Sequence, residues 1–175
     1  NIKEQEVLYP HLCRTTQDLT DALLSTDWAD WFAQELVEGQ SIYLCAYLDR
    51  SGRWSAYWQE NLLQQPNGKS IVLARTMSNP GLETSALMDG LHKYGFHGPF
   101  MMELIRDTSG SLKFIEVNPR FWGPLELGRK AFPQVLERFI EDVEGMSHMP
   151  STEFSSERVV WYAWAYGANQ ANLHR

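Results

Sequence analysis

The stretch that most constrains this fold is residues 101–123, MMELIRDTSGSLKFIEVNPRFWG. It consists of an apolar run, a polar turn and a second apolar run, and this pattern is typical of a β-hairpin. If the hairpin is centred near Ser109 and Gly110, antiparallel pairing sets position 103 almost opposite position 116. Both positions hold an acid inside an otherwise apolar strand, so we predict that Glu103 and Glu116 lie side by side.

Two carboxylates in this arrangement favour a bound cation. Cross-strand neighbours lie roughly 4.5–5.5 Å apart at Cβ, and like charges at that distance repel unless they are paired or metal-bound. Asn118 follows Glu116 by two positions, so it projects from the same face of the strand and adds a neutral oxygen. Hard oxygen ligands suit Mg²⁺ or Mn²⁺ better than zinc. Arg120, two positions further along, could neutralise an anion beside the metal.

Taken one at a time, these residues have an ordinary explanation, because a single Glu in a strand usually faces solvent and Asn-Pro commonly opens a turn. The joint pattern is an acid, 12 intervening residues and then EVNPRFWG. It resembles the metal-binding end of the ATP-grasp superfamily, in particular its carboxylate–amine ligase and carbamoyl-phosphate-synthetase-like branches. By this resemblance Glu103, Glu116 and Asn118 match the Mg²⁺ ligands. Arg120 matches the catalytic arginine that faces an acyl phosphate.

A second segment carries a weaker resemblance to the same superfamily. Residues 34–39, QELVEG, resemble the interdomain segment that recognises adenine in ATP-grasp proteins. By this match Gln34 would hydrogen-bond the adenine amino group, Glu35 would offer its carbonyl and Val37 its N–H group. The family often holds the ribose with an acid two residues past the glycine, whereas this chain has Ser41 there.

Basic residues are expected to meet phosphate or a substrate carboxylate in the strand at 71–77, where the family places them. Arg75 is the favoured candidate because it interrupts an apolar strand and precedes the loop at 79–81. Lys69 is the other candidate, and a solvated surface charge is an equally good interpretation of it.

Composition limits the classes of function. The chain has 175 residues of which 43% are hydrophobic, enough for one domain with a sizeable core. Its formal net charge of −7 argues against nucleic acid as a partner, since that binding depends on basic surface.

Cys13 and Cys45 lie in apolar surroundings and are interpreted as free, buried thiols. With no signal peptide expected at the start and no apolar run of the roughly 18 to 20 residues that a membrane span needs, we expect a cytoplasmic protein.

The expected fold class is α/β (α+β) and ATP-grasp-like, with a mainly antiparallel sheet flanked by helices and an incomplete N-terminal lobe. Periodicity and turn residues give the order of the elements. Besides the hairpin we predict strands at 7–13, 31–37, 41–48, 53–61, 71–77 and 157–166, loops at 62–70 and 146–156, and helices beginning at Thr15 or Thr16, over 83–94, and over 124–145 with an interruption at Pro133. Val135, Leu136, Phe139, Ile140 and Val143 are expected to form the apolar side of the last helix.

Three parts are expected along the chain. Residues 1–33 would be a remnant of the smaller ATP-grasp subdomain, 34–150 the large subdomain with the adenine segment and the metal site, and 151–175 a C-terminal strand and tail. The family places a lysine on a strand of the smaller subdomain, followed by a Gly-rich loop whose N–H groups cradle phosphate. Neither precedes Gln34, so the chain is expected to be inactive alone.

The resemblance implies an enzyme that binds ATP with Mg²⁺ or Mn²⁺, activates a small-molecule carboxylate as an acyl phosphate and couples it to an amine. An alternative is a non-catalytic nucleotide-binding or scaffold module of the same fold, supported by the missing lysine and by Ser41. In a third interpretation the chain is a structural interaction domain with incidental acids. Assembly as a homodimer is left open.

Overall fold

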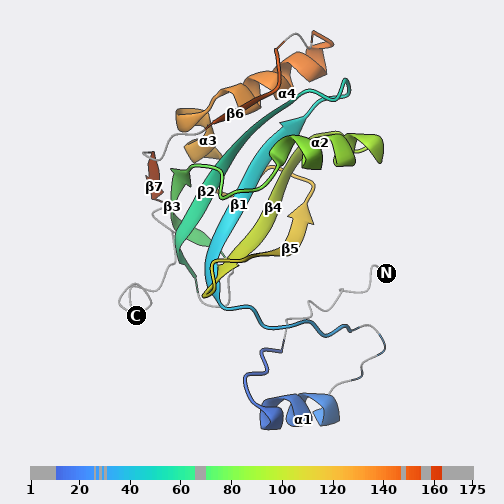
Figure 1. Ribbon diagram of the computed structural model, residues 1–175, viewed down its shortest axis with the longest axis vertical. Coiled ribbons are helices and arrows are strands. Elements are labelled where there is room, and N and C mark those ends of the chain that lie inside the picture. The colour runs from blue at the N-terminus through green and yellow to red at the C-terminus, as the bar shows by residue number, and fades with distance from the viewer. Residues whose placement is uncertain are drawn as a thin grey trace, which may run out of the picture. The chain divides into compact units, whose positions relative to one another are not determined.

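Apolar and polar side chains alternate along the central strands, and this alternation produces two different faces of one sheet. The computed structural model describes residues 11–25, 27, 29, 31–65, 70–146, 149–154 and 159–162. They belong to two compact units, Asn1–Glu38 and Gly39–Arg175. The described residues of the first unit include helix α1, and the second unit contains the sheet and its flanking helices (Figure 1).

The second unit is built on a seven-stranded sheet in the order β5-β4-β1-β2-β3-β7, with β6 paired to β2 (Figure 1). All pairs are antiparallel except β2 with β6. This confirms the mainly antiparallel sheet flanked by helices. The strands are β1 Gly39–Leu48, β2 Trp54–Gln64, β3 Ile71–Met77, β4 Gly98–Asp107, β5 Leu112–Asn118, β6 Thr152–Phe154 and β7 Val160–Tyr162.

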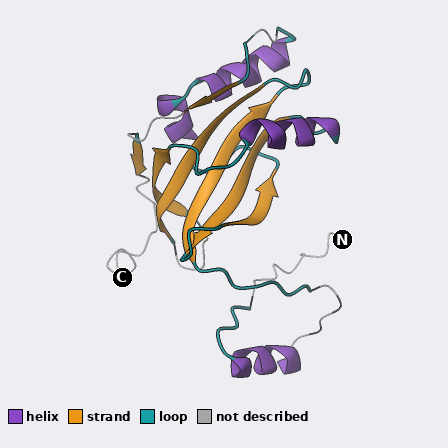
Figure 2. Ribbon diagram, viewed as in Figure 1, coloured by secondary structure: helices purple, strands orange, loops and turns teal. Residues whose placement is uncertain are grey.

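Helices cover both faces of the sheet (Figure 2). Helix α2, Thr84–Lys93, packs Met88 against the aliphatic residues of β1, and we call this side the α2 face. Helices α3, Leu125–Ala131, and α4, Gln134–Glu144, pack Leu127 and Val135 against the opposite side, which we call the α4 face. On β1 the α4 face carries Ser41, Tyr43, Cys45 and Tyr47. The α4 face of β1 thus carries hydroxyl and thiol groups, whereas its α2 face carries aliphatic residues such as Ile42 and Leu44.

In the first unit, helix α1 spans Thr16–Ser25, as predicted. Its start is a reciprocal cap: the Asp18 N–H donates to Thr15 Oγ1 at 3.1 Å, and the Thr15 N–H donates to the Asp18 carboxylate at 2.9 Å. The N–H groups of Arg14 and Thr15 lower the pKa of Asp18.

A buried ion pair joins α4 to the β1–β2 turn. Arg138 and Asp49 are both fully buried, and Arg138 Nη1 donates to Asp49 Oδ2 at 3.0 Å. Arg138 Nε also donates to Ser55 Oγ at 2.8 Å, and a third N–H reaches the Pro150 carbonyl. The other carboxylate oxygen of Asp49 accepts from the Arg53 N–H and from Ser51 within the turn. One carboxylate therefore organises both the turn and the helix that docks beside it.

The apolar side predicted for α4 is partly wrong. Val135 is buried, but Ile140 and Val143 are 52% and 65% exposed, whereas Arg138 and Asp142 are buried. A charged residue can occupy the buried side because its partner is already there. Asp142, for example, accepts from the Tyr47 hydroxyl at 2.9 Å.

The strand predicted at 31–37 is also wrong: residues 31–38 form neither helix nor strand. That strand needed an edge of β1, and both edges are occupied by β2 and β4. The glycine that follows lies close to β4, since a Cβ at Gly39 would lie 2.1 Å from the Arg106 carbonyl oxygen. Residues 7–10 of the first predicted strand lie outside the described residues, and 11–13 are irregular.

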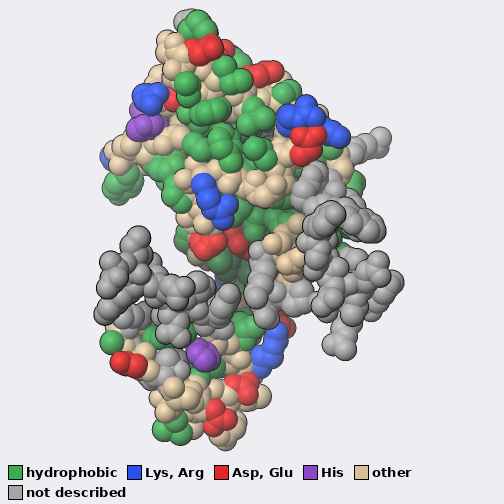
Figure 3. Space-filling model, turned by 180° about the vertical axis from the view of Figure 1, so that it is seen from behind, with side chains coloured by type: hydrophobic (Ala, Val, Ile, Leu, Met, Phe, Trp, Pro, Cys, Tyr) green, Lys and Arg blue, Asp and Glu red, His purple; other side chains and the backbone are tan. Residues whose placement is uncertain are grey.

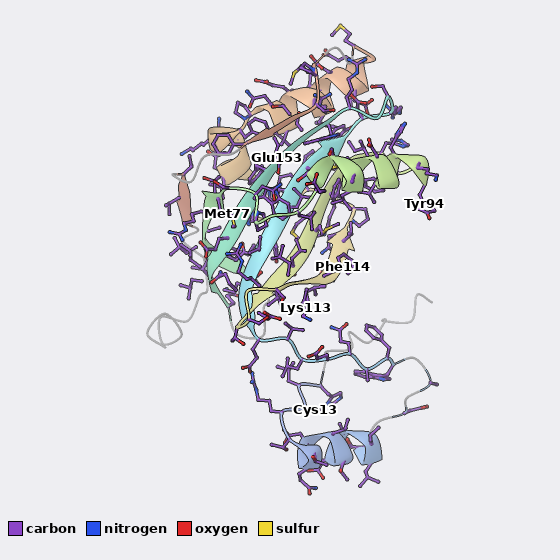
Figure 4. All side chains as sticks on the ribbon, viewed as in Figure 1. Cys13, Met77, Tyr94, Lys113, Phe114 and Glu153 are labelled. Atoms are coloured by element: carbon purple, nitrogen blue, oxygen red, sulfur yellow. The ribbon has the colours of Figure 1, made fainter. Side chains whose placement is uncertain are left out.

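Two other boundaries differ from the predictions. β2 continues to Gln64, into the loop predicted at 62–70, and β6 lies within the loop predicted at 146–156. β6 forms because β3 pairs with the later part of β2, which leaves the edge at 55–57 open. Its Glu153 (Figure 4) accepts from Thr84 Oγ1 at 3.0 Å and Asn79 Nδ2 at 3.1 Å, and so ties β6 to the start of α2.

The other elements follow the predictions closely. β3, α2, the β4–β5 hairpin and the helix interrupted at Pro133 lie where expected, and β7 falls within the predicted strand 157–166, of which only 159–162 are described. Cys13 and Cys45 are free thiols, and Cys45 is buried. Within the described residues, no helix combines the length and apolar character needed to cross a membrane.

Replacing Arg138 with Met should destabilise the protein strongly. Asp49 would remain buried without its counter-charge, which costs roughly 3–5 kcal/mol in comparable pairs. The free energy of unfolding from urea titration measures this loss. Arg129→Met is the matched control, because Arg129 is exposed and pairs with Glu126 at the helix surface; its unfolding midpoint should stay at the wild-type value. Equal midpoints for the two variants would contradict a stabilising role for the buried pair.

Candidate metal site

The β4–β5 hairpin positions the candidate site, and its turn explains why the hairpin forms here. The Asp107 carboxylate accepts from the N–H groups of Ser109 and Ser111, both at 2.9 Å. Gly110 has a φ of +87°, a conformation that glycine adopts without strain. The turn and the hairpin are as predicted from the sequence.

The register of the hairpin sets two acids directly opposite each other. Glu103 pairs with Glu116, and Met101 pairs with Asn118. The next pair is Leu104 with Phe114, so Ile115 is an extra residue that forms a β-bulge. Phe114 (Figure 4) therefore lies on the α2 face with Leu104, while Glu116 lies on the α4 face with Glu103. The bulge brings both carboxylates to one side of the sheet.

The two carboxylates form no ion pair among the described residues. Glu116 is exposed and Glu103 is half-buried, and no ion pair in the described part of the chain involves either of them. Asn118 Nδ2 donates to Glu116 Oε1 at 2.5 Å, so the amide lies in contact with the acid. Figure 3 shows the side of the molecule opposite α2, where acidic side chains lie beside a large hydrophobic area.

The donor set fits a hard divalent cation. No group of three or more His, Cys, Asp or Glu side chains suited to a metal occurs in the described residues. The third side chain beside Glu103 and Glu116 is instead the Asn118 amide, which completes an all-oxygen set of the kind that Mg²⁺ prefers. A cation there would also remove the repulsion between the opposed carboxylates.

Two hydroxyl groups lie beside Glu103. Ser41 Oγ donates to its Oε1 at 3.2 Å, and the Tyr43 hydroxyl lies close enough to favour the charged carboxylate. Burial raises the pKa of Glu103, and the Glu116 charge raises it further, while the two hydroxyl donors act in the opposite direction. Burial, together with the Glu103 charge, raises the pKa of Tyr43 well above its usual range.

The predicted arginines lie in different places. The Arg120 N–H donates to the Asn118 carbonyl at 2.8 Å, so these two residues share a tight turn at the end of β5. The Arg120 side chain is exposed, and its Nη1 donates to the Phe121 carbonyl at 3.1 Å. Arg75 instead pairs with Glu60 at 2.6 Å. In the sheet, Arg75 lies opposite Glu60 and Glu60 lies opposite Ile42, whose side chain is in the core of the α2 face. Arg75 therefore lies on the α2 face, away from the opposed carboxylates.

The residues predicted to bind adenine belong to the first unit. Gln34 and Glu35 are exposed and Val37 is half-buried, all within the irregular segment at 31–38. Their role in adenine recognition stays a prediction. Lys69 lies outside the described residues.

Sequence reasoning missed several residues on the α4 face. Ser41 and Tyr43 contact Glu103, and the buried amides Gln59 and Asn61 lie beside them on β2. Lys113 (Figure 4) is exposed on the same face, because it pairs with Ile105, the partner of Ser41. The signal was the strict alternation of SIYLCAYL, which gives a hydroxyl or thiol at every second position.

Comparisons with known proteins identify the fold. No protein-family model matches the chain, and no curated protein sequence matches it. Among solved structures, the biotin carboxylase domain of Hydrogenobacter thermophilus 2-oxoglutarate carboxylase, a dimer in complex with MgADP, ADP and bicarbonate, matches with a TM-score of 0.54 and 18% identity. It covers 65% of this chain and 26% of that chain.

Two further structures match to a similar degree. A complete pyruvate carboxylase from Rhizobium etli has a TM-score of 0.52 and 18% identity, over 69% of this chain and 13% of that chain. The phosphoribosylaminoimidazole carboxylase ATPase subunit from Aquifex aeolicus has a TM-score of 0.54 and 17% identity, over 70% of this chain and 39% of that chain. The chain therefore spans well under half the length of each of these three proteins. The matches confirm the ATP-grasp-like fold expected from the sequence.

The raised pKa of Glu103 predicts a pH dependence of stability. The folded protein holds the Glu103 proton more tightly than the unfolded chain does, in which the pKa of the glutamate carboxyl is 4.5. The free energy of unfolding should therefore fall as pH rises from 4.5 through the folded-state pKa. Glu103→Gln cannot lose a proton, so its stability relative to wild type should increase over that window. Urea titrations in EDTA at several pH values measure this difference; a difference that is constant or shrinks with pH would contradict the assignment.

Proposed function

We propose that this chain, which has the fold of the ATP-grasp superfamily, forms the Mg²⁺- and ATP-binding part of a ligase that activates a carboxylate as an acyl phosphate and couples it to an amine. The observation that carries this proposal is the direct pairing of Glu103 with Glu116 on one face of the sheet, where neither forms an ion pair with a described residue. Asn118 lies on the same face and Arg120 follows it within one turn.

Glu103, Glu116 and Asn118 would hold the metal. When bound, Mg²⁺ neutralises the charge of the ATP phosphates and orients them. The chain's own contribution is the placement of these oxygens by strand pairing, which is more rigid than placement by a loop. In support, the 2-oxoglutarate carboxylase domain with this fold is in complex with MgADP.

Arg120 would act on the anion that forms during the reaction. Its side chain is exposed, and its Nη1 donates to the neighbouring Phe121 carbonyl rather than to an acid. A guanidinium can donate two parallel hydrogen bonds to a phosphoryl group or to the oxyanion of a tetrahedral intermediate. Arg120 would therefore stabilise charge that develops in the transition state.

Gln34, Glu35 and Val37 would recognise adenine. They belong to a segment outside helices and strands, so no sheet ladder uses their backbone N–H and C=O groups. Arg75 is left out of this site because it pairs with Glu60 on the α2 face.

The carboxylate substrate would be small. Bicarbonate, the simplest such anion, is present in the 2-oxoglutarate carboxylase domain, which is also a dimer. We include a dimer in the proposal, and we place the protein in the cytoplasm, where the thiols of Cys13 and Cys45 stay reduced.

Glu116→Gln should abolish the Mg²⁺-dependent part of ADP binding, and also turnover, in the full-length protein. Glu116 is exposed, so the fold should be unaffected and the unfolding midpoint should stay near the wild-type value. Calorimetric ADP titrations with Mg²⁺ and with EDTA measure the first effect, and ATP-dependent phosphate release measures the second. A fully active Glu116→Gln protein would contradict the assignment of Glu116 as a metal ligand. Mg²⁺-dependent ADP binding without phosphate release by the wild type would favour the non-catalytic module instead.

Arg120→Met should lower kcat about 10²- to 10³-fold, the effect of removing one donor to a developing oxyanion. The KM for ATP should change little if Arg120 acts chiefly in the transition state. Steady-state kinetics of Arg120→Met beside Arg129→Met separate the two parameters, since Arg129 pairs with Glu126 outside the site. A rise in KM at constant kcat would assign Arg120 to ground-state binding.

A further inference from the structure

A continuous chain of hydrogen bonds runs through the α4 face and ends at Glu103. It starts in the loop after β5, crosses β2 and β1, and reaches the carboxylate on β4. We call it the donor chain: Trp122 Nε1 to Tyr57 OH at 2.6 Å, Tyr57 OH to Gln59 Oε1 at 3.4 Å, Gln59 Nε2 to Asn61 Oδ1 at 2.8 Å, Asn61 Nδ2 to Ser41 Oγ at 2.9 Å, and Ser41 Oγ to Glu103 Oε1 at 3.2 Å.

Every bond in the donor chain points the same way. Each side chain accepts from the one before it and donates to the next. Ser41 has a single hydroxyl proton, and because its oxygen accepts from Asn61, that proton is directed to Glu103. The donor chain thus ends in an acceptor, which is the role of a carboxylate oxygen.

The donor chain is buried except at Glu103. Tyr57 and Gln59 have no exposed surface, and Asn61 and Ser41 are 4% and 8% exposed. Apolar side chains such as Met101 and Leu127 pack on the same face, so the fold could have filled these positions without polar atoms. Buried amides add little net stability even when their hydrogen bonds are satisfied. These buried polar groups are connected by hydrogen bonds to Glu103, the residue of the donor chain that is accessible to water.

The other end of the donor chain lies in the loop that carries Arg120. Trp122 is 3% exposed, and its ring packs edge-on against Tyr57 with centroids 5.8 Å apart. The donor chain therefore connects the loop beyond Asn118 to Glu103 by a path through the sheet that is independent of the hairpin. Both ends of the candidate site are fixed to the same buried residues.

We infer that the donor chain is a positioning device for the metal site, with Asn61 and Ser41 as its positioning residues. They hold the Glu103 carboxylate in one orientation, because Ser41 Oγ donates to its Oε1. This inference rests on the proposed function, since it assigns a metal to Glu103. Partners that orient metal ligands in this way commonly contribute 10- to 100-fold to metal affinity.

The test measures how much Mg²⁺ strengthens ADP binding by the full-length protein. The readout is the Kd for ADP in EDTA divided by the Kd in Mg²⁺, which we call the Mg²⁺ ratio. Asn61→Leu and Ser41→Ala should each lower the Mg²⁺ ratio about tenfold through the Kd in Mg²⁺, with the Kd in EDTA unchanged. The double variant should lose no more than either single variant, because one break already interrupts the donor chain.

Thr76→Val is the matched control. Thr76 is a fully buried hydroxyl residue on the α4 face, where it pairs with Gln59, and its hydroxyl accepts from the Val159 N–H at 3.1 Å. It lies outside the donor chain. Its substitution should lower the unfolding temperature and leave the Mg²⁺ ratio at the wild-type value.

The outcomes separate this inference from the proposed function. A wild-type Mg²⁺ ratio of one would overturn both. A wild-type protein that responds to Mg²⁺ while Ser41→Ala keeps the full Mg²⁺ ratio would overturn the donor chain alone. Ser41→Ala decides the question by itself if Asn61→Leu does not fold, since it removes only a hydroxyl group. Additive losses in the double variant would also count against a single connected chain.

Discussion

The buried contact between Arg138 and Asp49 fixes the geometry on which the candidate site depends. It joins α4, the β1–β2 turn and the carbonyl of Pro150 just before β6. Because α4 is held at the turn, it covers the end of the α4 face that carries Tyr47, and its Asp142 bonds that tyrosine. The opposite end of the face, with Ser41 and the paired acids, keeps Glu116 exposed. The α4 face thus has one end covered by α4 and another end where Glu116 stays exposed.

The two faces of the sheet follow different physical rules. On the α2 face, aliphatic and aromatic side chains such as Leu44, Trp58 and Phe100 close a conventional hydrophobic core. On the α4 face, apolar packing around Tyr57 and Leu127 surrounds a line of satisfied polar groups. The first face supplies stability through burial of apolar area. The second accepts polar groups in its interior and gains a defined orientation at its edge.

The hairpin and its register could be predicted because turn residues and strand lengths are local properties. Strand pairing then required Glu103 to face Glu116, and the structure has that pair. The strand at 31–37 could not be excluded in this way, since its failure depends on β1 already having two neighbours.

The burial of Arg138 could not be predicted from the sequence either, because its partner Asp49 lies 89 positions away along the chain. The donor chain combines residues from β1, β2, β4 and a loop, and only the assembled sheet brings them together. Local patterns therefore predicted the acids of the site, while the groups that hold those acids in place required the tertiary structure.

The bulge at Ile115 has a consequence for the variation this sequence can tolerate. If Ile115 were paired regularly instead of bulging, it would lie opposite Glu103, and Glu116 would lie beside Met102, in the hydrophobic core of the α2 face. A one-residue insertion between Phe114 and Glu116 that kept the bulge would therefore turn an acid and an amide inward, although composition would hardly change, whereas deletion of Ile115 would leave Glu116 opposite Glu103. Length changes in the turn at 107–111 would leave the side-chain directions of the paired strands intact. Insertions accumulated over time should thus collect in the turn and be lost from the short segment that contains the bulge.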